Sequence, residues 1–224
     1  MARKLRIGAL ASGGGSNLQS IIDSCSSGSL AAEIVLVLTN NPEAGALSRA
    51  KQAGIPALCL DHRHYSKRED FDHAVVKALR DAGVELVVLA GFMRLISPVF
   101  LEAFPGRIMN IHPALLPAFP GLHVQRKALE YGARFAGCTV HFVDGGVDTG
   151  PIIIQAIVPV LDDDTEASLS ARILQQEHRI YPRAIQLFSE GRLRIEGRRV
   201  LIDPPCPPPI RAMINPPLLP DCKE

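Results

Sequence analysis

The feature that most constrains the fold is an alternation of short apolar runs with segments of helical periodicity. Leu5 to Ala11 is a run of strand length, and Ile34 to Thr39 (IVLVLT) is a second run, rich in β-branched residues. Between them, Ser16 to Ser26 carries apolar residues at helical spacing, with Ser16 as the expected N-cap and Gly28 as a stop. A strand, a helix and a strand in this order predict a parallel pair joined by a crossover helix.

The same pattern repeats along the next part of the chain and predicts an α/β fold. We expect a single Rossmann-like domain with a mostly parallel sheet and helices on both faces. Its ligand crevice would lie beyond the carboxyl ends of the strands. The further predicted elements are a helix from Pro42 to Gln52, a strand from Ala57 to Leu60, a helix from Glu69 to Ala82, and strands from Glu85 to Ala90 and from Arg107 to Ile111.

The last third of the domain adds segments of a different kind. An alternating run and a further strand, joined by the tight connection VDGGVD, predict an antiparallel pair at one edge of the sheet. A long helix follows, with a kink expected at Pro182, and then a closing hairpin. These predictions cover strands from Gly137 to Val143 and from Pro151 to Val160, a helix from Thr165 to Ser189, and hairpin strands from Arg192 to Glu196 and from Arg199 to Ile202.

The bulk properties fit one domain, residues 1–202, followed by a proline-rich C-terminal tail, residues 203–224. Lys and Arg number 24 against 23 Asp and Glu, so the chain lacks the basic surface that nucleic-acid binding needs, and no run is long and apolar enough to span a membrane. Five scattered cysteines without a CxxC pair speak against a disulfide framework or a zinc cage. We therefore expect a cytoplasmic protein with neither nucleic acid nor membrane as partner.

The segment ASGGGSN, from Ala11 to Asn17, joins the first predicted strand to the first predicted helix. Backbone N–H groups at a helix N-terminus attract anions, and Ser16 and Asn17 can add donors. The segment lacks a P-loop lysine, and its glycines do not fit GxGxxG. A single phosphate is therefore the preferred ligand, and a glycine-rich turn before a capped helix is the alternative.

A second segment, NIHPALLPAFPG, begins at Asn110 and follows the carboxyl end of a predicted strand. Asn110 and His112 are two residues apart on that strand, so both can donate to one oxygen, and the prolines stiffen the loop. Asp144 and Asp148 could supply the carboxylate that favours the charged form of His112. Alone, the histidine could equally be structural and the aspartates could be turn residues; His141 is read as structural.

Glu177 stands on the apolar stripe of the long helix, where a carboxylate needs a partner. A cationic substrate group would suit, and a salt bridge to an arginine is the alternative. The histidines lack metal-ligand spacing, so no metal site is predicted. Neither a GxSxG nor a Cys-His signature marks a covalent nucleophile.

Taken together, GGGSN, VLAGFMRLIS, NIHPALLPAFPG, GCTVHFVDGGVDTGPII and QQEHRIYP stand in an order that resembles the phosphoribosylglycinamide formyltransferases, within the folate-dependent formyltransferase family. The resemblance covers about Leu5 to Ile202, leaving out the proline tail. It implies transfer of a formyl group from the co-substrate 10-formyltetrahydrofolate to the amine of glycinamide ribonucleotide, a step of purine biosynthesis. The reaction that the resemblance implies requires no metal.

The resemblance also assigns residue roles. It implies a catalytic trio of Asn110, His112 and Asp148. The nucleotide contacts would be Gly15, Ser16, Asn17 and Glu177. The folate contacts would be Arg68, Met93, Arg94, Leu95, Ile96, Asn110, Asp144, Gly145, Gly146, Val147 and Asp148.

Three other functions compete with this one. Hydrolysis of 10-formyltetrahydrofolate would use the same trio, but such relatives usually carry an N-terminal module, for which a first strand at Leu5 leaves no room. Methionyl-tRNA formyltransferases carry a substantial C-terminal RNA-binding domain, whereas this sequence has only the proline-rich tail after Ile202. A phosphate-binding protein without turnover would not need Asn110, His112 and Asp148 together. We expect a monomer or a weak homodimer.

Overall fold

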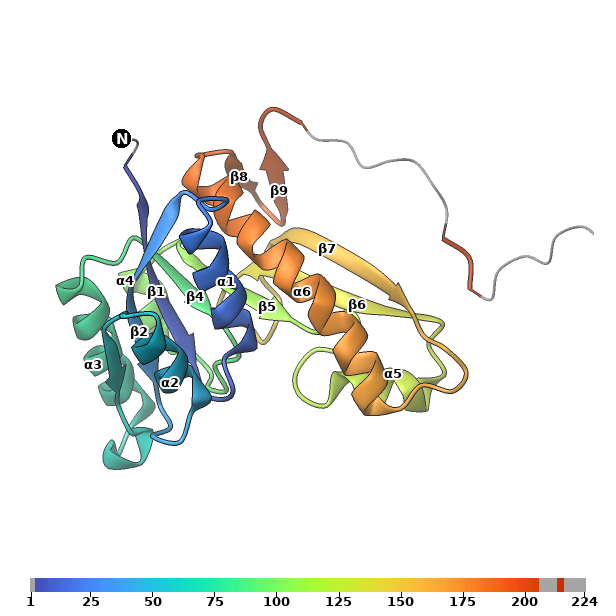
Figure 1. Ribbon diagram of the computed structural model, residues 1–224, viewed down its shortest axis with the longest axis horizontal. Helices are drawn as coiled ribbons and strands as arrows, with labels where there is room; N and C mark the ends of the chain where they lie inside the picture. Colours follow the sequence, from blue (N-terminus) through green and yellow to red (C-terminus); the bar gives the residue numbers. More distant parts are fainter. Residues whose placement is uncertain (1–2, 206–212, 216–224) are drawn as a thin grey trace, which may run out of the picture.

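The computed structural model describes residues 3–205 and 213–215. Within them the chain forms a nine-stranded sheet in the order β3-β2-β1-β4-β5-β6-β7-β9-β8, with helices packed against it (Figure 1). The strands are β1 (Leu5–Ala11), β2 (Ala32–Thr39), β3 (Ala57–Cys59), β4 (Leu86–Leu89), β5 (Ile108–His112), β6 (Phe135–Phe142), β7 (Ile152–Pro159), β8 (Leu193–Glu196) and β9 (Arg199–Ile202). The helices are α1 (Ser16–Ser26), α2 (Gly45–Gln52), α3 (Arg68–Asp81), α4 (Pro98–Ala103), α5 (Val124–Tyr131) and α6 (Glu166–Ser189).

The first five strands are parallel and confirm the α/β prediction. From β1 the chain adds β2 and then β3 on one side, and it later returns to add β4 and β5 on the other. The strand order therefore reverses between β1 and β4. In open α/β sheets such a reversal point opens a crevice at the carboxyl ends of the strands, where ligands bind.

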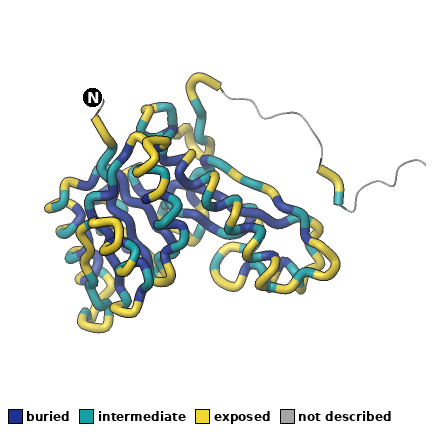
Figure 2. The backbone as a smooth tube through the Cα atoms, viewed as in Figure 1, coloured by how far each residue is buried: buried dark blue, intermediate teal, exposed yellow. Residues whose placement is uncertain are grey.

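Helices cover both faces of the sheet, as predicted. One core cluster packs α1, α2 and α6 against the sheet, and the other packs α3 and α4 against the opposite face. In β4, Leu86 and Val88 belong to the first cluster, whereas Val87 and Leu89 belong to the second. A strand buried on both faces has no polar side, which explains the unbroken apolar run in the sequence. Figure 2 shows the buried strands enclosed by more exposed helices.

The antiparallel part of the sheet differs from the prediction in two respects. β6 pairs antiparallel with β7, as predicted, and also with β5. The pair is not at the edge, however, because β9 continues the sheet beyond β7 and the hairpin partner β8 forms the border. The connection from Val143 to Pro151 is also longer than the tight turn we expected. It is this connection that carries Asp148.

Several helical segments were missed or misplaced. The short helices α4 and α5 and the 3₁₀ turn His62–His64 were not predicted, because each has too few buried residues to show a helical period. α2 begins at Gly45 and not at Pro42, since a turn closed by the Ala44 N–H and the Asn41 carbonyl precedes it. α6 continues through Pro182. Most of the predicted tail lies outside the described residues.

Candidate active site

Four polar side chains from two neighbouring strands and one loop meet in one cluster near the carboxyl end of β5. Asn110 and His112 lie on β5, His141 lies on the neighbouring β6, and Asp148 lies in the loop from β6 to β7. Asp148 Oδ2 is 3.4 Å from His112 Nδ1, and its Oδ1 is 3.4 Å from Asn110 Nδ2 and 3.7 Å from His141 Nε2. The structure thus brings together the three predicted catalytic residues around one carboxylate.

Asp148 is held in place by its backbone and by its partners. Its φ of 54° lies in the left-handed region that non-glycine residues seldom adopt, so the surrounding contacts hold a strained residue. The Gly121 N–H donates to Oδ2 at 2.9 Å. Burial alone would raise the pKa of Asp148, but His141, the Gly121 amide and His112 outweigh burial and hold the pKa below its ordinary value. The carboxylate is therefore ionised at neutral pH.

His112 is buried, with only 4% of its surface exposed. Its Nε2 donates to the Phe119 carbonyl at 2.9 Å, because a carbonyl oxygen can only accept. Burial lowers the pKa of His112, whereas the Phe119 carbonyl and Asp148 act in the opposite direction. Asp148 favours the charged imidazole, as expected from the sequence, but in the unliganded chain burial wins. A ligand oxygen that develops negative charge at Nε2 would shift that balance.

His141 belongs to the cluster, although its sequence position led us to read it as structural. It is 2% exposed, and it stands directly opposite Asn110 in the antiparallel register of β5 and β6. Its Nδ1 donates to the Phe142 carbonyl at 2.8 Å, and its Nε2 lies 3.2 Å from Asn110 Nδ2. When neutral, His141 accepts from the Asn110 amide; when charged, it can donate to Asp148. The role of His141 in the cluster follows from its pairing with Asn110 across the two strands, and a single sequence does not reveal such pairing.

The glycine-rich loop after β1 forms the second part of the crevice. Gly15 is the N-cap of α1, with φ 73°, and Ser16 is the first helical residue, so the prediction of Ser16 as N-cap is wrong. A side chain at Gly15 would meet Ala46 at about 3 Å, which explains why glycine stands where the loop approaches α2. The first N–H groups of α1 have no partner within the helix and are available to an anion.

Asn17 and Glu177 are joined across this part of the crevice. Asn17 Nδ2 donates to Glu177 Oε2 at 2.6 Å, and Asn17 Oδ1 is buried without a hydrogen-bond partner in the described structure. Among the described residues the partner of Glu177 is therefore Asn17 and not an arginine, contrary to the alternative. Burial, the larger cause, raises the pKa of Glu177, and the bond from Asn17 opposes it. Two acceptors are thus held side by side in a poorly hydrated place, which favours a ligand that donates.

The residues predicted to bind folate lie on four separate segments, one of which is β5 with Asn110. In the segment after β4, Met93 and Leu95 are 66% and 58% exposed, and the Arg94 guanidinium stacks 4.9 Å above the Phe71 ring of α3. Arg68 is the first residue of α3 and is exposed. The Met93 N–H donates to Ser12 Oγ at 2.8 Å and so links the loops that follow β4 and β1. Ile96 lies in the segment after β4, and Asp144, Gly145, Gly146 and Val147 lie in the loop of Asp148.

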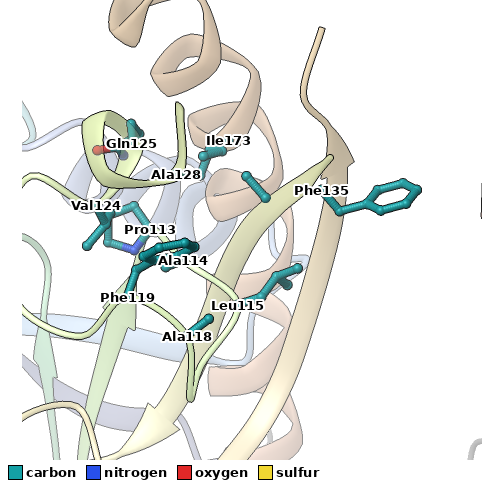
Figure 3. Close-up of a pocket in the computed structure, with 11 residues that line it drawn as sticks. Pro113, Ala114, Leu115, Ala118, Phe119, Val124, Gln125, Ala128, Phe135 and Ile173 are labelled. Atoms are coloured by element: carbon teal, nitrogen blue, oxygen red, sulfur yellow. The ribbon is translucent and has the colours of Figure 1, made fainter. Parts of the chain in front are cut away.

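Two cavities lie near the cluster. A cavity of about 310 Å³ is lined by Pro117 and Pro120 of the proline loop and by Asp148 and Thr149 of the loop after β6. A smaller one, of about 90 Å³, lies among the residues shown in Figure 3 from the proline loop, α5, β6 and α6. Its walls are mostly apolar, and neither Asp148 nor Glu177 reaches it. The larger cavity therefore adjoins the polar cluster directly, whereas the smaller one does not.

The part of the chain that the structure describes holds no group of three or more His, Cys, Asp or Glu side chains placed to bind a metal ion. Within residues 3–205 and 213–215, none of the helices has the length and apolar character needed to cross a membrane. Cys138 lies on β6, its thiol is buried, and burial raises the pKa of that thiol to about 12. That thiol is therefore a poor nucleophile.

Comparison with known proteins gives a consistent result. The family model described as formyl transferase matches residues 5–185. The phosphoribosylglycinamide formyltransferase of Escherichia coli is 43% identical over 199 residues, which are 89% of this chain and 94% of that protein. The solved structure of glycinamide ribonucleotide transformylase 1 from Symbiobacterium toebii superposes with a TM-score of 0.89 at 55% identity, covering 90% of this chain and 95% of that one.

A longer relative shows the same similarity over part of its length. The trifunctional purine biosynthetic protein adenosine-3 of Drosophila melanogaster is 50% identical over 191 residues, which are 84% of this chain. The chain spans only 14% of that protein's length. The matched region is thus a fraction of the trifunctional relative and nearly the whole of the Escherichia coli one.

Proposed function

The chain belongs to the formyl transferase family, and we propose that it transfers the formyl group of 10-formyltetrahydrofolate to the amine of glycinamide ribonucleotide. The products would be formylglycinamide ribonucleotide and tetrahydrofolate. The observation that carries the proposal is the cluster in which Asp148 contacts Asn110 and His112. The extent of the match to the Escherichia coli enzyme supports the choice of substrates.

The chemistry of the cluster fits direct transfer between two substrates. Asn110, His112, His141 and Asp148 carry no hydroxyl or thiol, and the reaction needs none because the substrate amine is itself the nucleophile. The amine nitrogen bonds to the formyl carbon, and negative charge collects on the formyl oxygen. The bond from that carbon to the folate nitrogen then breaks, and one proton passes from the amine to the leaving nitrogen.

Each residue of the catalytic trio has a defined role in these reaction steps. His112 Nε2 and the Asn110 amide are the donors for the formyl oxygen. In the unliganded chain Nε2 is bonded to the Phe119 carbonyl and the Asn110 amide to Asp148 and His141, so both donors must exchange partners when substrate binds. Asp148 stabilises the charge that His112 gains, and it can accept the proton released by the amine.

The rest of the crevice supplies binding. The N-terminus of α1 with Gly15, Ser16 and Asn17 would hold the phosphate of the nucleotide, and Glu177 with Asn17 Oδ1 would accept from the ribose hydroxyls. Folate would lie against the segment after β4 and the loop of Asp148. The cationic residues Arg68 and Arg94 would face its carboxylates.

The test follows the release of tetrahydrofolate spectroscopically from 10-formyltetrahydrofolate, with and without glycinamide ribonucleotide. We expect tetrahydrofolate to be released only when the nucleotide is present. In His112→Ala this release should be lost, while the nucleotide still binds. Release in water alone would make the protein a hydrolase. Nucleotide binding without any release would make it a binding protein.

A further inference from the structure

The loop that carries Asp148 is braced from within by close contacts. Asp144 Oδ1 accepts from Thr149 Oγ1 at 2.6 Å and from the Gly146 N–H at 3.1 Å. A side chain at Gly146 would lie 2.1 Å from Thr149 Oγ1, and one at Gly150 would lie 1.8 Å from the Phe142 carbonyl. The loop is therefore folded tightly upon itself and against the end of β6.

On its other side the same loop is poorly supported. The cavity of about 310 Å³ adjoins Val147, Asp148 and Thr149, so few atoms pack there to stop the loop from shifting. Asp148 itself is strained, with φ 54°, and a strained residue relaxes when its restraints are removed. The Gly121 N–H and the neighbouring side chains hold the Asp148 carboxylate, but a further contact is needed to hold the loop backbone beside the cavity.

Arg198 makes such a contact from a distant part of the chain. It follows Gly197 in the turn between β8 and β9, and its Nη2 donates to the Thr149 carbonyl at 2.7 Å. Arg198 also lines the cavity, together with Pro117 and Pro120 of the proline loop. The turn is held in position because β9 pairs with β7 at Arg199 and Ile152. The terminal hairpin thus reaches the residue that immediately follows Asp148.

We propose that Arg198 is a positioning residue, whose bond to the Thr149 carbonyl holds Asp148 at the distance from His112 and Asn110 that formyl transfer requires. The inference rests on the proposed function for its kinetic consequence, but its structural part does not depend on turnover. Arg198 touches neither reacting atom. It acts through the backbone on the carboxylate that His112 needs.

The experiment compares Arg198→Ala with Arg194→Ala, both in the full chain. Arg194 is a matched control, because it is an exposed arginine of the same hairpin that pairs with Glu196 on its own strand. We expect Arg198→Ala to lower kcat about tenfold, with KM for glycinamide ribonucleotide nearly unchanged, because a shift of about 1 Å in a catalytic group can cost up to a hundredfold. Arg194→Ala should keep the wild-type kcat, and Arg198→Lys, which can still donate one hydrogen bond, should recover part of the loss.

A second measurement needs no activity. The titration of the His112 imidazole is followed by NMR in the wild type and both alanine variants. The charged or titratable groups facing His112 are Asp148 in the loop, His141 on β6 and Lys127 on α5. If Asp148 moves away, the pKa of His112 should fall in Arg198→Ala and stay unchanged in Arg194→Ala.

Two results would overturn the inference. One is an unchanged His112 titration and kcat in Arg198→Ala; the other is an equal loss in Arg194→Ala, which would mean that the hairpin matters only for stability. If the alanine variant does not fold, Arg198→Gln carries the same comparison. Should the wild type transfer no formyl group, the proposed function fails, while the NMR titration still decides whether Arg198 positions Asp148.

Discussion

The substitution Glu177→Gln tests whether Glu177 serves to bind the nucleotide or to stabilise the fold. If it serves binding, the variant should be at least as stable as the wild type but should bind the nucleotide more weakly. Glu177 is 6% exposed, and burial raises the pKa of its carboxyl. Its neighbour Asn17 donates to Oε2, while Asn17 Oδ1 has no partner in the described structure. A glutamine at this position keeps an acceptor for Asn17 Nδ2 and adds a donor that can reach Asn17 Oδ1.

Without ligand, Glu177→Gln should therefore be at least as stable as the wild type. Filling a missing hydrogen bond contributes about 0.5–1.5 kcal/mol, and replacing a buried carboxyl by a neutral amide removes a desolvation cost. Nucleotide binding should change in the opposite direction, because hydrogen bonds to a charged acceptor contribute about 1–1.5 kcal/mol more than neutral ones. With Asn17 Oδ1 also occupied, the dissociation constant for glycinamide ribonucleotide should rise about tenfold or more.

Urea unfolding of the unliganded protein measures the first effect, and isothermal titration with glycinamide ribonucleotide measures the second. Glu130→Gln is the matched control, since Glu130 is an exposed glutamate on α5, and it should change neither quantity. A Glu177→Gln protein that is less stable yet binds the nucleotide as the wild type does would refute the argument.

Three further predictions concern the cluster. His112→Ala should lower kcat by about 10²–10³ through loss of an oxyanion donor, with nucleotide affinity kept; steady-state kinetics and isothermal titration check both, and near-normal turnover would contradict it. Gly150→Ala should cost several kcal/mol of unfolding free energy in urea, because its Cβ would lie 1.8 Å from the Phe142 carbonyl, whereas Gly145→Ala, which meets no atom within 4 Å, should cost much less. Burial lowers the pKa of His112 in the folded protein, so as the pH falls below about 6.5 the unfolded chain binds a proton at this imidazole before the folded chain does, and the free energy of unfolding decreases. His112→Gln should therefore lose less stability than the wild type between about pH 7 and 5.5. An equal loss in urea unfolding would contradict the prediction.

The sequence was sufficient for the parallel half of the fold because each element there has its own local signal. The residues of β1 and of α1 match the predicted ranges. Burial on both faces gives β4 an unbroken apolar run, and α6 shows a helical stripe over many turns. Helices such as α4 and α5 lack that signal, since only two residues of each are buried.

The candidate site was predictable only in part, for a similar reason. Asn110 and His112 share one strand, so their common face follows from strand geometry. His141 joins them through the antiparallel register of β6, and Asn17 meets Glu177 through the packing of α1 against α6. Such contacts depend on tertiary arrangement. The same is true of Arg198, which reaches the loop of Asp148 only because the terminal hairpin joins the sheet at β7.

The destination of the formyl carbon tests the central claim most directly. The protein is incubated with 10-formyltetrahydrofolate carrying ¹³C in the formyl group and with glycinamide ribonucleotide, and the products are identified by mass spectrometry and ¹³C NMR. The account predicts that the label appears in formylglycinamide ribonucleotide, and that Asp148→Asn slows its appearance strongly. Label recovered as free formate, or label that stays on folate while the nucleotide binds, would contradict it.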